Sequence, residues 1–379
     1  MRVDFPIKDN IITWAIERAG YQFMDFVLKF PPVKDWLEHT KKPTFKQLEE
    51  FSNKVHIPFG YLFLDEPPLE QLPIPFYRTG KGETRQVSIN VYDTILSLQR
   101  RQDWLEEYLE SEDQDMVPFV GRYNVHTSAE TIINDIRTTL DLPFGWTNNF
   151  PKHEDALNYL IGKVESSGIV VVFNSVVGNN NTRKIDVEEC RGFILIGKYA
   201  PFMFVNAADS KSAQLFTVMH ELAHIWLGKS AGFDNGTMLP ADDPIEILCD
   251  KVAAEFLVPG RELMRLWTDA STGSLYQLSR YFKVSTIVIA RRALDLGKMP
   301  KQTFFAFYRR YQEDLAERKL KQSGGGDFYA SQGKRISLKF ASHINRALKE
   351  NKILYRDAYQ LTGLRGNTFA RFVKELLHQ

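Results

Sequence analysis

The stretch FTVMHELAHIWLG, residues 216–228, decides more about the fold than any other part of the chain. Its two histidines, His220 and His224, are four residues apart, which is about 400° of rotation on an α-helix, so both imidazoles project from one face. The neighbouring residues are apolar, as in a buried helix, and Gly228 ends the pattern. Histidine and glutamate side chains are costly to bury without a partner, and a metal ion supplies one. We therefore expect a Zn²⁺ site on a buried helix.

Glu221 follows the first histidine directly, which places its carboxylate beside the metal rather than on it. There it can take a proton from water and pass it to a leaving amine. The alternative is a structural histidine pair on a core helix. A strand hairpin before the helix and a glycine after it favour the metal site, and no other pair among the eight histidines has ligand spacing.

A catalytic zinc needs a third protein ligand and an open position. No histidine follows soon after His224, so we expect a carboxylate. The candidates are Asp234, Asp242, Asp243, Glu246, Asp250 and Glu255. The first three lie in a polar loop, and the others lie on a predicted helix over 244–257. Glu246 and Asp250 are four residues apart, so one could bind the metal while the other orients a ligand histidine, and local spacing does not choose between them.

Composition sets broad limits. The chain has 379 residues, enough for two or three domains, and it is 44% hydrophobic and 25% charged, as in globular proteins. A formal net charge of +1 gives no chain-wide sign of a nucleic-acid partner. Cys190 and Cys249 make no disulfide framework, and we expect free, buried thiols. With no signal-peptide pattern and no membrane-length apolar run, we expect a soluble cytoplasmic protein.

Helical and extended patterns divide the chain into five parts: a helical unit at 1–66, a proline-rich linker or arm at 67–87, a helical region at 88–150, a sheet with the histidine helix at 151–300, and a helical region at 301–379. Within the fourth part we expect strands at 169–173, 191–197 and 202–208, the last two as a hairpin, and a loop at 176–184. An extended substrate strand could add to an edge at 202–208. The fold class is α+β, mainly helical, with a small antiparallel sheet.

The histidine helix and the segment EILCDKVAAEFLVP, residues 246–259, together resemble the ImmA/IrrE family of metallopeptidases. The resemblance covers roughly residues 150–300. It implies a zincin-like protease core in which Glu246 is the third zinc ligand, and a protein substrate such as a helix-turn-helix repressor of mobile elements or stress responses. Cys249 and Asp250 stand where the family has Ala-Asn, and Val252 stands where it has Phe.

The N-terminal unit resembles the helix-turn-helix modules of Xre-type regulators, with 33–39 as recognition helix and Lys34, His39, Lys41 and Lys42 as candidate DNA contacts. Asp35 and Glu38 on the same helix argue against DNA, and residues 1–64 hold nine Lys/Arg and eight Asp/Glu. DNA binding needs several phosphate contacts. A module that docks a protein, or the protease domain itself, is the other interpretation.

The C-terminal region is strongly basic: residues 318–379 hold thirteen Lys/Arg and four Asp/Glu. A solvated basic face is the usual interpretation of such a stretch, and binding of nucleic acid or of an acidic partner is the alternative.

Taken together, the patterns predict a zinc-dependent regulatory endopeptidase that cleaves a repressor or a toxin–antitoxin-type partner. The alternatives are a DNA-binding regulator or antitoxin whose metal site is structural or vestigial, and a pure interaction scaffold.

Overall fold

A computed structural model of the chain describes residues 7–72, 74, 87–233, 243–269, 271–321 and 328–376. Internal contacts divide the chain into two compact units, one of residues 1–73 with 86–95 and one of 74–85 with 96–379. The five-part division remains a prediction. Among the described helices, none combines the length and the apolar character that crossing a membrane would require.

The first unit is a small helical bundle. Its helices are α1 Asp9–Arg18, α2 Phe23–Lys29, α3 Pro32–Leu37 and α4 Phe45–Val55, followed by the 3₁₀ turn η1 Phe59–Phe63. A capping box begins α4, because Thr44 Oγ1 accepts from the Gln47 amide at 3.3 Å and Gln47 Oε1 accepts from the Thr44 amide at 2.9 Å. Aromatic rings fill the core, with Phe51 packed against Phe26 and Trp36.

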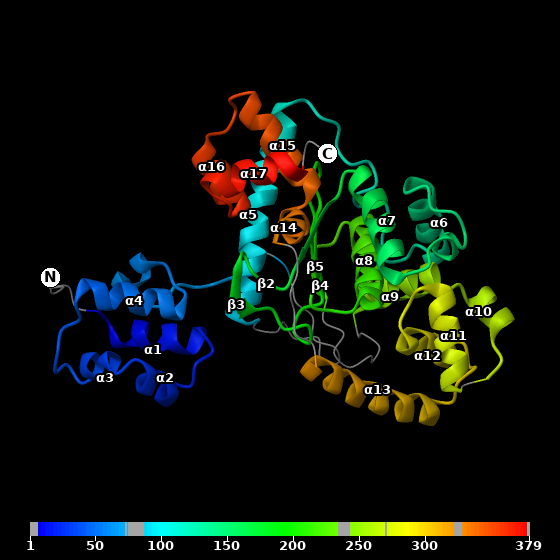
Figure 1. Cartoon of the computed structure of the whole chain (residues 1–379), viewed down its shortest axis with the longest axis horizontal. Coiled ribbons are helices and arrows are strands. Elements are labelled where there is room, and N and C mark those ends of the chain that lie inside the picture. Colours follow the sequence, from blue (N-terminus) through cyan, green and yellow to red (C-terminus); the bar gives the residue numbers. More distant parts are fainter. Residues whose placement is uncertain are drawn as a thin grey trace. The chain divides into compact units, whose positions relative to one another are not determined.

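The second unit is built around a four-stranded sheet with strand order β1-β5-β4-β6 (Figure 1). The strands are β1 Val170–Asn174, β4 Gly192–Leu195, β5 Phe202–Asn206 and β6 Ala231–Phe233. β1 pairs parallel with β5, and β4 pairs antiparallel with both β5 and β6. The predicted hairpin is therefore present and the fold is mainly helical, but the sheet is mixed and not antiparallel as predicted, because β1 and β5 are parallel.

Two expectations about the strands were wrong. Segment 202–208 is not an edge, because β5 lies between β1 and β4 and its backbone is paired on both sides. Segment 176–184 is not a loop, because β2 Val176–Val177 and β3 Asn180–Lys184 form a separate antiparallel hairpin. Strand order depends on long-range pairing, and a polar asparagine-rich strand has no apolar alternation, so local patterns missed both.

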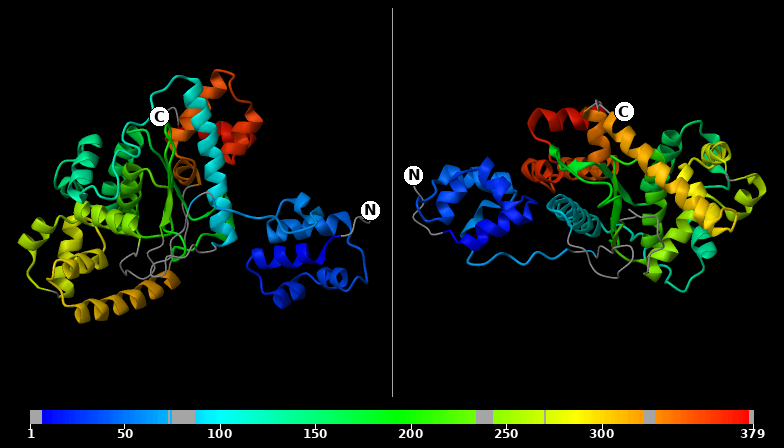
Figure 2. Two further views of the ribbon diagram at one scale, coloured as in Figure 1. Left: turned by 180° about the vertical axis from the view of Figure 1, so that it is seen from behind. Right: turned by 90° about the horizontal axis from the view of Figure 1, so that it is seen from below.

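Helices cover both faces of the sheet (Figures 1 and 2). On one face lie α7 His153–Ser166 and α8 Lys211–Leu227, with α9 Pro244–Leu257 packed on α8. On the other face, Phe202 of β5 contacts Phe340 of α15, which also contacts Trp104 of α5. Helix α8, which carries the predicted metal ligands His220 and His224, is thus buried between the sheet and α9.

The other helices of the described residues complete the list of elements. They are α5 Ile89–Ser111, α6 Ala129–Thr139, η2 Trp146–Asn149, α10 Gly260–Leu266, α11 Thr272–Phe282, α12 Thr286–Asp295, α13 Lys301–Lys321, α14 Phe328–Ile336, α15 Leu338–Lys349, α16 Tyr355–Thr362 and α17 Gly366–Leu376. One apolar core joins α6, α7, α8, α9, α11 and α12, so residues 117–304 share a single interior.

Candidate metal centre

Helix α8, which carries the two histidines, has well-defined ends and is mostly apolar and buried from Leu215 to Leu227. Ser210 Oγ caps the start by accepting from the Ala213 amide, and Gly228 ends the helix in the left-handed conformation at φ 63°. His220 and Glu221 are completely buried and His224 is 1% exposed. Both imidazoles therefore project from one face of a buried helix.

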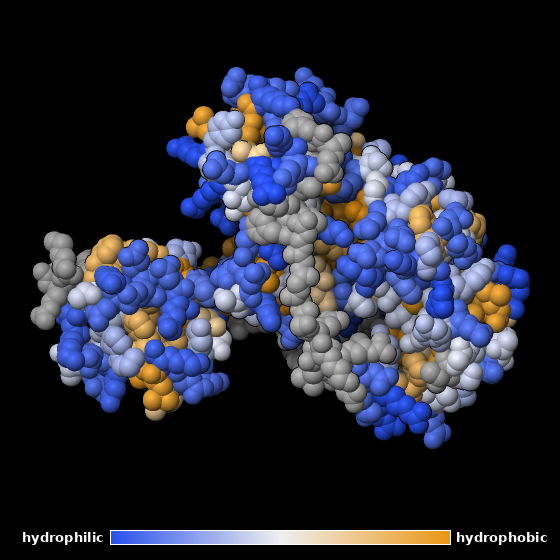
Figure 3. Space-filling view, viewed as in Figure 1, coloured by the Kyte–Doolittle hydropathy of each residue, from blue (hydrophilic) through white to orange (hydrophobic). Residues whose placement is uncertain are grey.

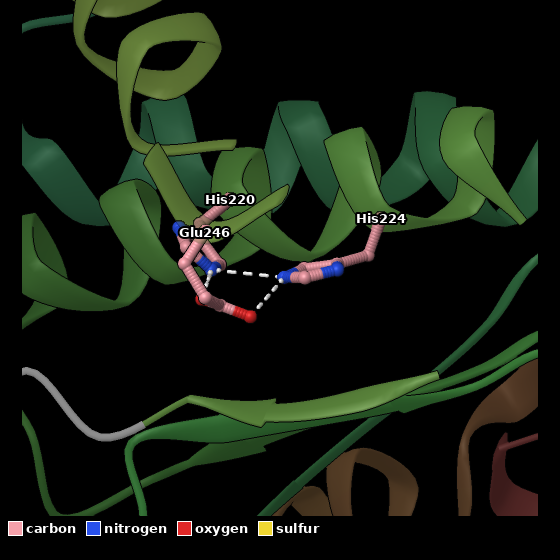
Figure 4. A group of neighbouring side chains, drawn as sticks. All are labelled: His220, His224 and Glu246. Atoms are coloured by element: carbon pink, nitrogen blue, oxygen red, sulfur yellow. Dashed lines mark hydrogen bonds and ion pairs between the residues drawn. The ribbon is translucent and has the colours of Figure 1, made fainter. Parts of the chain in front are cut away.

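Helix α9 brings a carboxylate to the same place. Asp243 caps its start by accepting from the Ile245 and Glu246 amides, and Pro244 occupies the first turn. Glu246 then lies one turn into the helix, where its side chain meets both histidines (Figure 4). Its Oε2 is 3.1 Å from His220 Nε2, its Oε1 is 3.2 Å from His224 Nε2, and the two Nε2 atoms are 3.1 Å apart.

Asp250, one turn further along α9, lies on the opposite side of the His220 ring, with its Oδ1 3.0 Å from His220 Nδ1. The two carboxylates that local spacing could not separate thus occupy different positions. Glu246 is at the atoms that could bind a metal, and Asp250 is at the far nitrogen of one imidazole, where it can fix the ring orientation and tautomer.

The close approach of these histidines and carboxylates changes the pKa values of their side chains. Burial alone would lower the pKa of His220, but its hydrogen bonds to Asp250 and Glu246 outweigh burial and raise the pKa to about 10. Burial would raise the pKa of Glu246, but the two histidines hold that pKa well below its ordinary value. Burial lowers the pKa of His224. The site therefore favours a negative Glu246 surrounded by cationic or donor groups.

A divalent cation fits this group on two observations. One ligand atom from each of His220, His224 and Glu246 lies within 4.8 Å of the others, and all three residues are buried. In addition, neither carboxylate oxygen of Glu221 has a hydrogen-bond partner among the described residues, although both are buried. An unpartnered buried carboxylate is costly, and a cation with its bound solvent would supply the missing interactions. Two imidazoles and a carboxylate are a donor set that suits Zn²⁺.

Glu221 lies beside the group rather than within it. Burial raises the pKa of Glu221 well above its ordinary value, while the nearby His220 opposes this rise. Strand β4 forms the wall on the other side: a Cβ atom added to Gly192 would lie 3.1 Å from Glu221 Oε1 and 2.5 Å from Thr217 Cγ2. Gly192 was not among the predicted site residues. A glycine inside an apolar strand is the only signal it offered.

The other carboxylate candidates are elsewhere. Asp243 caps α9, and Glu255 pairs with Arg292 and accepts from the Gly260 amide. Asp234 and Asp242 lie outside the described residues. Both cysteines are free and buried, as expected, and burial raises the pKa of Cys249 well above its ordinary value.

The candidate DNA contacts of the first unit lie close to carboxylates of the same unit. Lys34 Nζ is 3.8 Å from Glu38, Lys41 Nζ is 2.8 Å from Asp35, and His39 Nε2 is 3.4 Å from Asp9. Lys42 also has an interaction partner. The helix-turn-helix interpretation of this unit gains no support from the structure and remains a prediction.

Comparison with known proteins matches two segments of the chain. Residues 164–294 match the family model of the IrrE N-terminal-like domain, a peptidase family designated M78. This segment contains β1, β5, α8 and α9, and therefore the whole candidate site. Residues 336–375 match the model of a domain of unknown function, DUF8813. A search of curated proteins found no match.

Proposed function

We propose that the chain is a zinc-dependent endopeptidase that cleaves a protein substrate for a regulatory purpose. One observation carries the proposal: a buried His-His-Glu group from α8 and α9 has an unpartnered buried carboxylate, Glu221, directly beside it. The match of residues 164–294 to a typically metal-dependent peptidase family supports it.

In this proposal His220, His224 and Glu246 hold the zinc ion. When bound, zinc polarises a peptide carbonyl and makes water more acidic. Glu221 accepts a proton from the attacking water at one carboxylate oxygen and donates it to the nitrogen of the leaving amine. Burial raises the pKa of Glu221 well above its ordinary value, and a carboxyl group with a raised pKa holds the proton more readily before it donates it. Asp250 accepts from His220 Nδ1 and holds the imidazole in the ligand orientation.

The substrate would be an extended protein segment added to the sheet at β6, Ala231–Phe233. β6 is an edge strand, paired only with β4 in the described part of the sheet, and the other edge strand, β1, is packed against α14. Strand addition to an edge gives a peptide backbone hydrogen bonds without fixing its sequence. A transcriptional repressor or a toxin–antitoxin partner is the substrate class that the resemblance to ImmA/IrrE proteins suggests.

The test compares the wild-type chain with Glu221→Gln, Glu130→Gln and His220→Ala expressed in cells. Glu130 is an exposed glutamate on α6, so Glu130→Gln controls for the chemical change itself. We expect about one zinc per chain in the first three proteins and none in His220→Ala. New protein N-termini should appear with wild type and Glu130→Gln, and cleavage should fall by about 10²–10⁴-fold in Glu221→Gln.

Because the substrate is unidentified, Glu221→Gln also serves as a trap, and mass analysis of the protein that co-purifies with it should identify the partner. The proposal fails if Glu221→Gln keeps zinc and full biological activity. That result would favour a DNA-binding regulator with a structural metal site. A wild-type protein without zinc and a harmless His220→Ala would favour an interaction scaffold.

A further inference from the structure

The last part of the chain is a compact group of helices, α14 to α17, on the second unit (Figures 1 and 2). Helices α15 and α17 both pack on α14, and α16 packs on α15. Their core is apolar and almost completely buried: Ile336, Phe340, Ala341, Ile344, Ala347, Ala358, Leu364, Phe369 and Phe372. The group is therefore a folded module rather than a tail.

Helices α16 and α17 are joined by a tight turn of three residues, 363–365. Gly363 takes the left-handed conformation at φ 71° and its amide donates to the Tyr359 carbonyl at 2.9 Å. The next residue, Leu364, is 3% exposed and inserts into the core. The Gly363 carbonyl accepts from Asn179 Nδ2 of the β2–β3 hairpin at 3.3 Å, which holds the turn in place. Tyr355 and Tyr359 of α16 contact Phe369 of α17, and two short helices joined by a three-residue glycine turn are the connection typical of a helix-turn-helix.

Helix α17 has two chemically different faces. Phe369 and Phe372 face the core, whereas Asn367, Ala370, Arg371 and Lys374 are exposed and follow one another at helical spacing. The exposed stripe is thus made of amide, small and basic side chains, of which Arg371 donates from Nε to Glu375 Oε1 at 2.6 Å and would exchange this exposed pair for a DNA contact. Arginine and asparagine are the side chains that most often read guanine and adenine edges in the major groove, and a small residue between them permits close approach.

Charge is concentrated in the same module. Residues 328–376 hold ten Lys/Arg and three Asp/Glu, whereas the complete chain has a formal net charge of only +1, so the remainder is net acidic. Lys349, Arg356 and Arg365 are exposed near the two ends of α16. Figure 3 shows a largely hydrophilic surface over these helices. Such a clustered excess of positive charge matches the phosphate backbone, whose neutralisation provides most non-specific affinity for DNA.

We infer that residues 336–376 form a helix-turn-helix module that binds duplex DNA, with α17 in the major groove. Asn367 and Arg371 face the base edges, and Arg365 and Lys374 face phosphates. This inference rests on the turn geometry, the split faces of α17 and the local charge, and it is independent of the peptidase proposal. Single-stranded nucleic acid, double-stranded RNA and an acidic protein are the competing partners.

The experiment measures binding of the full-length protein to labelled 30-base-pair duplex DNA of random sequence by fluorescence anisotropy at several salt concentrations. Single-stranded DNA and double-stranded RNA of the same length are measured alongside, together with an acidic polyglutamate peptide. The test variant is Arg365→Ala/Arg371→Ala/Lys374→Ala. The control is Lys301→Ala/Arg309→Ala/Arg310→Ala, which removes the same charge from exposed positions on α13.

We expect wild type to prefer duplex DNA, with an affinity that falls steeply with salt. The variant Arg365→Ala/Arg371→Ala/Lys374→Ala should bind duplex DNA at least about tenfold more weakly, and its affinity should depend less on salt. The control with three substitutions on α13 should bind like wild type. The inference is overturned if duplex DNA is not bound at 50 mM salt, if another partner is preferred, or if both variants lose equal affinity.

Groove reading is tested separately by selecting bound sequences from the random duplex pool. Wild type should enrich a short DNA motif. The single variant Arg371→Ala changes an exposed side chain and leaves the core intact, and it should lose the base preference at about one or two positions of that motif. Equal enrichment by both proteins, or no enrichment, would contradict the assignment of α17 as a recognition helix.

Discussion

At the scale of single residues, the space beside Glu221 depends on Gly192 of β4. We predict that Gly192→Ala reduces the proposed peptidase activity by about 100-fold, because the added Cβ would lie 2.5 Å from Thr217 Cγ2 and 3.1 Å from Glu221 Oε1 and would displace the proposed general base by about a few tenths of an ångström or more. Cleavage of the trapped substrate and zinc content measure the effect, and zinc content should not change.

Thr217→Ser provides the matched control, because it removes the nearest clashing methyl group. In the Gly192→Ala background it should restore part of the activity. Full activity of Gly192→Ala alone would show that the wall beside Glu221 tolerates a methyl group and that this residue is not critical.

The residues of the site differ in how far the sequence could predict them. His220 and His224 were recognisable because a helix brings residues four apart onto one face. Glu246 and Asp250 also share a helix face, so their spacing does not distinguish them. Only the packing of α9 against α8 shows that Glu246 faces the Nε2 atoms of both histidines and that Asp250 faces Nδ1 of His220. Gly192 could not be found, since its neighbours Thr217 and Glu221 lie on another element.

At the scale of elements, helices were predictable because their signals are local. Thr44 and Gln47 begin α4, and Gly228 ends α8, where the sequence indicated. Strand order was not predictable, because β5 lies inside the sheet only through pairing with β1, some thirty residues earlier. The packing of α16 and α17 was not predictable either: the basic charge was visible, but the burial of Leu364, Phe369 and Phe372 depends on α14 and α15.

Helix α15 contains a partly buried titratable group, His343. Burial lowers its pKa to about 4, with Lys339 and Arg346 adding to the effect, and its ring lies edge-on to Tyr108. Because the folded state binds this proton less well than the unfolded state, stability is complete above pH 6.5 and is lost as the pH falls towards 4. We predict a loss of up to about 3 kcal/mol from this residue.

Urea unfolding of the metal-free chain at pH 7 and pH 4.5 measures the loss, with His343→Phe as the control. Phenylalanine keeps a ring of similar size beside Tyr108 and cannot be protonated, so the variant should lose less stability on acidification than wild type. Identical pH dependence in the two proteins would show that His343 does not titrate in this range.

At the scale of the whole molecule, the second unit joins two chemistries on one sheet. The candidate metal centre lies on the α8 face, and the basic helices contact the other face through Phe202 and Phe340. They are also tied to neighbouring helices, because Ser337 donates to Glu165 of α7 at 2.5 Å and Arg101 of α5 donates to the Arg335 carbonyl at 3.2 Å. A protease core and a DNA-binding module fixed to one sheet would suit an enzyme that acts on DNA-bound repressors.

The final prediction concerns metal removal, which should affect the two units differently. A ligand that binds only the folded state stabilises it by about 2.7 kcal/mol at 100 times its dissociation constant, which corresponds to roughly 4 °C for a unit of about 300 residues. Calorimetry of the full chain with zinc and with chelator should therefore show the transition of the second unit, which holds His220, His224 and Glu246, moving down by that amount. The transition of the first unit serves as an internal control and should not move, and His224→Ala should abolish the response because it removes a ligand. A shift of both transitions, or a shift that persists in His224→Ala, would place the stabilising metal somewhere other than the group on α8 and α9.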